Sequence, residues 1–130
     1  MKKLILIASL IIFPTSGKWL QAQEWHDVTI TVYNPTASQC DSTPLITACN
    51  KKIDLSQLKA GQLRWIAVSR DLLAKYPYGT SMYLWIAEGH PKNGTYIVRD
   101  TMNKRYTNTI DILTYNETRG KWHGKIQKNP

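Results

Sequence analysis

Motifs for the commonest enzyme chemistries are missing from this 130-residue sequence. It contains no glycine-rich loop that would cradle a phosphate, no helix with paired metal-binding residues and no nucleophilic serine elbow. His26, His90 and His123 are scattered, and no histidine or cysteine pair has the spacing of zinc ligands. We therefore expect no metal ion and no other cofactor.

Cysteine is scarce, with only Cys40 and Cys49 in the whole chain. In an oxidising compartment, an even number of cysteines close in sequence predicts one disulfide that closes a short loop. A zinc site is the weaker alternative, because the histidines do not cluster near this pair.

Long apolar runs are also lacking. The stretch LILIASLIIF has ten residues, whereas a membrane-spanning helix needs ~20. It follows Lys2 and Lys3 and precedes a small-residue site ending at Ala22, which is the pattern of a secretory signal peptide. We expect residues 1–22 to be a signal and residues 23–130 to form one exported domain, periplasmic or secreted, with no membrane span.

Acidic residues are outnumbered, with 17 lysines and arginines against nine aspartates and glutamates and a formal charge of +8. Without Lys2, Lys3 and Lys18 the count is 14 against nine, which still leaves +5. A basic exported domain suits an anionic partner such as a cell wall or membrane surface, and nucleic acid is not expected outside the cytoplasm. We expect a monomer.

Short β-prone stretches separated by turn-rich loops make up most of the remaining chain. One or two helical turns are expected at 69–76, and a long ordered loop at 34–52. The pattern favours an all-β domain, either a small barrel or a sandwich. The expected strands are 27–33, 64–69, 81–88, 95–100, 109–114 and 121–127, and the expected core includes Trp65, Leu84, Trp85, Ile86, Ile97, Ile110 and Ile112.

Two aspartates stand beside or within β-prone runs, Asp100 after TYIV and Asp111 inside TIDIL. Side chains alternate between the faces of a strand, so Ile110 and Ile112 share one face and Asp111 points from the other. Taken alone, this pattern is explained by a solvent-facing aspartate. The alternative is that the carboxylates meet in a groove.

Three segments together favour the groove. IAVSRDLL at 66–73 is followed by YGT at 78–80, then YIVRDTMNKR at 96–105 and NTIDIL at 108–113. This arrangement resembles the 3D domain, named for its three aspartates, which belongs with membrane-bound lytic transglycosylase A, RlpA-like proteins, barwin and expansin. The resemblance implies a six-stranded double-psi β-barrel with one or two short helical turns and a groove across one face.

The resemblance also implies roles for individual residues. Asp111 would be the catalytic acid, supported by Asp100 and Asp71. The groove would be lined by Tyr33, Thr47, Thr80 and Thr101, and Lys104 and Arg105 would either hold the peptide carboxylates of the substrate or form a solvated turn. One departure is that catalytic relatives commonly have TGG after the second aspartate, where this chain has Thr101 followed by MNKR.

Peptidoglycan glycan strands are the partner that the resemblance implies. A lytic transglycosylase would cleave the bond between N-acetylmuramic acid and N-acetylglucosamine with one acid, forming a 1,6-anhydro sugar. The alternative is an expansin-like binding module without catalysis, which the missing glycines favour. A third possibility is a glycoside hydrolase, with Asp71 or Asp41 as the base.

Overall fold

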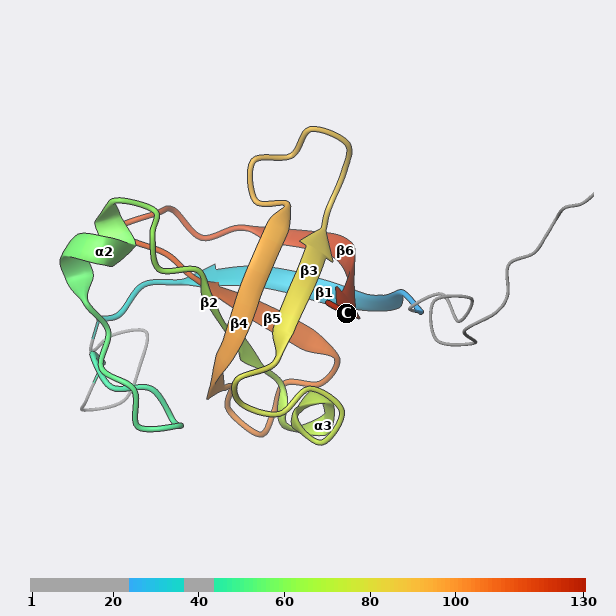
Figure 1. Ribbon diagram of the computed structural model, residues 1–130, viewed down its shortest axis with the longest axis horizontal. Coiled ribbons are helices and arrows are strands. Elements are labelled where there is room, and N and C mark those ends of the chain that lie inside the picture. Colours follow the sequence, from blue (N-terminus) through green and yellow to red (C-terminus); the bar gives the residue numbers. More distant parts are fainter. Residues whose placement is uncertain (1–23, 37–43) are drawn as a thin grey trace, which may run out of the picture.

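The computed structural model describes residues 24–36 and 44–130, and in that part of the chain it contains six strands and two short helices (Figure 1). The predicted all-β class is confirmed. The strands are β1 (His26–Tyr33), β2 (Trp65–Val68), β3 (Ser81–Trp85), β4 (Gly94–Thr101), β5 (Thr109–Leu113) and β6 (Lys121–Lys128), and the helices are α2 (Leu55–Lys59) and α3 (Arg70–Leu73).

The six strands close into a barrel in the order β1, β5, β2, β4, β3, β6. Two neighbouring pairs, β1 with β5 and β2 with β4, run parallel, and the other four pairs are antiparallel. Closure leaves no free sheet edge, and it decides between the two predicted architectures in favour of the six-stranded barrel.

Alternate residues of the strands fill the barrel interior. Ile30, Ile66 and Ile110 are fully buried there, as the two-residue period of a strand requires. Leu84, Ile110 and Ile112 join this core as predicted. Trp85 does not, because its ring lies on the outer face, where the Lys125 ammonium stands 4.9 Å from the ring centroid.

Gly124 of β6 lets two strands approach closely inside the barrel. A Cβ atom at this position would lie 2.4 Å from Ile30 Cδ1 and 2.6 Å from the carbonyl oxygen of Trp85. Any larger residue would therefore force the backbone or Ile30 to move.

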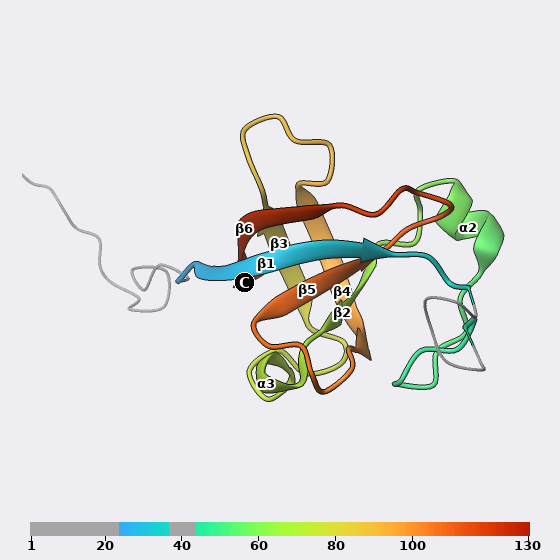
Figure 2. The ribbon, with the colours of Figure 1, turned by 180° about the vertical axis from the view of Figure 1, so that it is seen from behind.

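A second apolar cluster lies on the outer face of the barrel, beneath the chain that connects β1 to β2. Ile53 and Leu58 from this connection pack with Tyr33, Ala67 and Leu113 from the strands. The connection includes α2, which the sequence did not predict; it starts at its N-cap Asp54, whose side chain accepts hydrogen bonds from the amides of Ser56 and Gln57. Figures 1 and 2 show α2 and α3 on opposite sides of the barrel.

The connection between β3 and β4 begins earlier than the sequence predicts, because β3 ends at Trp85. The side chain of Asn93 accepts a hydrogen bond from the Ile86 amide at 2.7 Å and donates one to the Ala87 carbonyl at 2.6 Å. These bonds replace those that a longer strand would make. In the described part of the chain, no helix has the length and apolar character needed to cross a membrane.

Candidate functional site

Four residues on the outer face lie side by side across four adjacent strands. Thr31 of β1 pairs with Asp111 of β5, Asp111 pairs with Ala67 of β2, and Ala67 pairs with Asp100 of β4. We call these four residues the aspartate row. The small side chain of Ala67 separates the two carboxylates, so the row has acidic groups on both sides of an alanine.

A β-bulge turns Asp100 into this row. Ile66 pairs with Val98, but the next residue, Ala67, pairs with Asp100, so Arg99 is the extra residue in β4. Strict alternation from the buried Val98 would point Asp100 inward. The bulge instead places it opposite Ala67, because an inserted residue shifts the side chains that follow it.

Asp111 is half-buried, and its environment favours the protonated form. Burial is the main cause that raises its pKa from 3.8 to about 6, and the nearby Asp100 carboxylate adds a smaller increase. Two groups oppose the change: the Thr31 hydroxyl, which donates to Asp111 Oδ1 at 2.8 Å, and the positive charge of Arg119. The aspartate row therefore holds a carboxyl group that titrates close to neutral pH.

Asp100 is surrounded by donors. Its Oδ1 accepts hydrogen bonds from the amides of Ala48 at 2.8 Å and Thr101 at 2.9 Å, and its Oδ2 accepts one from the Tyr33 hydroxyl at 3.2 Å. Three donors hold this side chain in one orientation. The two aspartates thus have different surroundings, one low in water and one rich in donors.

Thr47 contributes by shaping the turn that reaches Asp100. It is buried, and its hydroxyl accepts a hydrogen bond from the Lys51 amide at 3.0 Å. The Thr47 amide also donates to the Lys51 carbonyl at 2.9 Å, which closes the turn and presents the neighbouring Ala48 amide to Asp100. Tyr33 and Thr47, both predicted to line a groove, therefore meet at Asp100, Tyr33 directly and Thr47 through this turn.

Asp71 is placed differently from the other two aspartates. It is exposed in the first turn of α3, and both of its oxygens accept from the Asn108 amide, at 3.0 and 3.2 Å. A hydrogen bond from Ser69 is the main cause that lowers its pKa. These are the contacts of a residue that ties α3 to the start of β5, and the structure does not bring Asp71 into the aspartate row.

Of the other residues predicted to bind substrate, one lies beside the aspartate row and three do not. Thr101 follows Asp100 and its hydroxyl contacts the Tyr78 hydroxyl, so it stays beside the row. Thr80 uses its hydroxyl to bond the Pro77 carbonyl at 2.6 Å. Lys104 and Arg105 are exposed in the connection from β4 to β5, where the Arg105 guanidinium lies 4.8 Å from the Tyr106 ring centroid.

The predicted disulfide stays a prediction, because Cys40 and Asp41 lie outside the described residues. Cys49 is half-buried and forms no disulfide within the described residues, and its sulfur lies 3.4 Å from Thr47 Oγ1. Within residues 24–36 and 44–130, no group of three histidine, cysteine, aspartate or glutamate residues is arranged to hold a metal ion.

Three residues in or beside the row were not predicted from the sequence. Thr31 and Arg119 act on Asp111 from β1 and from the connection before β6. Arg99, the bulged residue, stands over the Trp65 ring at 5.7 Å, and its Nε is buried with no hydrogen-bond partner in the described structure. The alternation of Thr31 with Val32 in a β-prone run could have indicated that Thr31 faces outward. Nothing in the local sequence indicates that it pairs with β5.

Comparisons with known proteins give a structural neighbour and no sequence relative. No protein-family model matches the chain, and no curated protein matches it by sequence. The crystal structure of apo expansin from Clavibacter michiganensis matches with a TM-score of 0.55 and 14% identity. The match covers 82% of this chain and 51% of the expansin chain, so this chain spans about half the length of that protein.

At this identity the likeness establishes the fold. It supports the six-stranded barrel that the sequence resemblance implied, while the resemblance to the 3D domain stays a prediction from the quoted motifs. The roles of Asp111, Asp100 and Asp71 in catalysis remain predictions.

Proposed function

We propose that this protein is a cell-wall glycan-binding module with an expansin-like barrel, and that glycan strands lie along the aspartate row. The observation that carries the proposal is the set of acceptors on one outer surface. Asp111, Asp100 and the Thr31 hydroxyl are aligned across neighbouring strands, and sugar hydroxyls pair with such groups. The barrel shared with an expansin supports a wall partner, and so does the formal charge of +5 that remains without Lys2, Lys3 and Lys18.

The turn after Asp100 supports binding without cleavage. Met102 stands where catalytic relatives commonly have glycine, and it is buried in the outer apolar cluster with its amide bonded to the Val68 carbonyl at 2.9 Å. A buried methionine side chain takes the place of the open backbone that a sugar would otherwise approach.

A sacculus pull-down tests this function. The purified protein should be retained on peptidoglycan sacculi and release no soluble sugar products. Asp100→Ala should weaken retention, while Asp27→Ala, which removes an exposed acid from β1, serves as the matched control. Equal loss of wild type and both variants in the wash would contradict the proposal.

Lytic transglycosylase activity is the second candidate, and the environment of Asp111 favours it. A carboxyl group with a pKa of about 6 can donate a proton to the glycosidic oxygen. The resulting carboxylate can then accept the proton of the muramic acid C6 hydroxyl as the 1,6-anhydro ring forms, so protons balance without water. Asp100, on the other side of Ala67, would lie beside the sugar ring as a second acidic group.

Mass spectrometry of digested sacculi separates the two functions. Transglycosylase activity would release anhydro-muropeptides, and release should decline as the pH rises above about 6, because Asp111 must hold a proton. Asp111→Asn should abolish release and keep the fold. Absence of anhydro products at pH 5 would leave the binding module as the function.

A further inference from the structure

A cavity of about 610 Å³ lies at the end of the barrel where β5 ends and β2, β4 and β6 begin. This volume is within the ~300–1,000 Å³ of ordinary ligand sites. Leu113, which lines it, is two residues after Asp111 on the same face of β5, a separation of ~7 Å along a strand. The cavity therefore adjoins the aspartate row but contains neither aspartate.

Positive charge predominates around this cavity. Lys59 reaches it from α2, Arg64 from the start of β2 and Lys92 from the connection between β3 and β4. Among the lining residues the only acid is Glu117, whose Oε1 lies 2.6 Å from Lys92 Nζ. The lining thus has an excess of cations, which suits a ligand that carries carboxylates.

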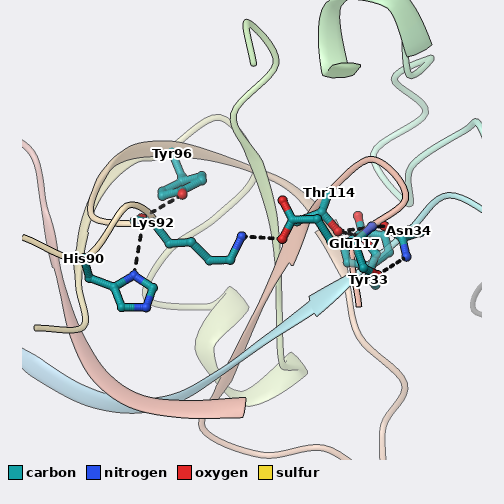
Figure 3. Close-up of polar contacts among 7 residues, drawn as sticks. All are labelled: Tyr33, Asn34, His90, Lys92, Tyr96, Thr114 and Glu117. Carbon is teal, nitrogen blue, oxygen red and sulfur yellow. Dashed lines mark hydrogen bonds and ion pairs between the residues drawn. The ribbon is translucent and has the colours of Figure 1, made fainter. Parts of the chain in front are cut away.

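The rim of the cavity is held in place by hydrogen bonds (Figure 3). Asn34 Oδ1 accepts from Thr114 Oγ1 at 2.8 Å and from the Glu117 amide at 3.1 Å, and its Nδ2 donates to the Glu117 carbonyl at 2.9 Å. The Lys92–Glu117 ion pair extends this network to the connection between β3 and β4. A rim fixed in advance lowers the cost of ordering on binding.

The walls add a donor and apolar surface. Lys92 donates its amide hydrogen to His90 Nδ1 at 3.1 Å, so the ring proton resides on Nε2. This Nε2–H has no hydrogen-bond partner among residues 24–36 and 44–130. The His90 ring packs edge-on against Trp122, with 5.6 Å between centroids, and Trp122 and Tyr115 give the cavity its accessible aromatic surface.

We propose that this cavity binds the acidic peptide stem of peptidoglycan, while the attached glycan lies along the aspartate row. The inference rests on the proposed function, and it specifies peptide-bearing strands as the preferred ligand. Carboxylates of the stem would pair with Lys59 and Arg64, and its aliphatic parts would pack against Trp122 and the exposed Tyr115. Lys104 and Arg105, which were expected from the sequence to hold peptide carboxylates, lie at the end of the barrel opposite this cavity.

Two substitutions with opposite expected effects test the cavity directly. The probe is a synthetic N-acetylated stem peptide, Ala–γ-Glu–diaminopimelate–Ala, titrated into ¹⁵N-labelled protein. The comparison is the fully amidated peptide, which lacks every carboxylate and keeps only the diaminopimelate ammonium. Lys59→Gln should weaken binding of the acidic peptide about two- to fivefold, the range expected for one exposed charge. Glu117→Gln removes the competing carboxylate from Lys92 and should strengthen binding by a similar factor.

Lys128→Gln, an exposed lysine at the end of β6, removes the same charge elsewhere and should leave the affinity unchanged. Opposite changes cannot arise from partial unfolding, which would weaken binding in both variants. The inference is overturned if the acidic peptide does not bind, if the amidated peptide binds equally well, or if the Lys59 and Glu117 variants change in the same direction.

A sacculus experiment separates this inference from the proposed function. Wild-type protein should bind intact sacculi more strongly than glycan strands stripped of peptides by an amidase, and Lys59→Gln should lose that preference. Equal binding to both materials would overturn the peptide site and leave glycan binding intact. Binding to neither would overturn the proposed function, and the peptide titration would still decide the cavity.

Discussion

The inner face of the strands is fully shielded from water, whereas the outer face is shielded only in part, and by different means. On the inner face, Ile110 and Ile66 are fully buried because the strands alternate and the barrel closes. On the outer face, the connection from β1 to β2 packs over the strands and forms a second apolar cluster around Ala67. The first environment follows from local sequence pattern, whereas the second requires a distant segment to fold over the barrel.

This difference decides what Asp111 can do. A carboxyl group on an open strand face would be fully solvated, but burial raises the pKa of Asp111 to about 6. The predictions below test the two faces separately, beginning with the largest effect.

Replacing Ile66 with alanine should cause the greatest loss of stability. Its side chain is fully buried inside the barrel, and such truncations cost about 2–5 kcal/mol. Ile97→Ala is the matched outer-face variant, and it should cost less than about 2 kcal/mol, since that side chain is only half-buried. Urea denaturation measures both. Equal losses would mean that the two faces are protected alike.

Asp111→Asn should stabilise the protein in a pH-dependent way. The folded protein holds this proton more tightly than the unfolded chain, whose ordinary pKa is 3.8. Stability is therefore greatest below about pH 4, falls as the pH rises to about 6, and stays lower above that. Asparagine cannot ionise, so the variant avoids this loss.

At pH 7.5 the gain in unfolding free energy should be about 1–2 kcal/mol, which allows for partial solvent screening of a half-buried group. At pH 3.5 the gain should disappear. Denaturant unfolding at both pH values measures this, and a gain that is the same at both would show that charge is not the cause.

Tyr33→Phe probes the donors around Asp100. The ring should keep its place in the outer cluster, while Asp100 loses the hydroxyl that donates at 3.2 Å. We expect a loss of about 1 kcal/mol at neutral pH, typical of one hydrogen bond. Thermal unfolding measures this loss of stability. Tyr33→Phe should cost less when it is introduced into Asp100→Asn than when it is introduced into the wild-type protein. An equal loss of stability in the wild-type and Asp100→Asn proteins would contradict the hydrogen bond between Tyr33 and Asp100.

The smallest effects concern the two groups that lower the pKa of Asp111. Thr31→Val removes the hydroxyl that stabilises the carboxylate, and Arg119→Gln removes a favourable charge. Both should raise this pKa, Thr31→Val by more, and only the Arg119 effect should diminish in high salt. Carboxyl ¹³C titration by NMR measures the change, and a lower pKa in either variant would contradict these contacts.

Much of the barrel could be predicted from the sequence, because alternation and turn residues mark each strand. The outward direction of Asp111 also followed from Ile110 and Ile112 on either side of it. The position of Asp100 did not, since a bulge at Arg99 changes the alternation. The influence of Arg119 on Asp111 could not be predicted either, because it depends on how the connection before β6 folds.

Asn34 has a consequence for anyone wishing to modify this protein. Both ends of its carboxamide hold the connection between β5 and β6, so a graft at 114–117 would disturb the row and the cavity together. The connection between α3 and β3 offers an alternative at Lys75, which is exposed and lies outside both the row and the cavity lining. An affinity tag or fluorescent label inserted there should leave glycan capture unaltered, making this position a practical handle for imaging the protein on intact cell walls.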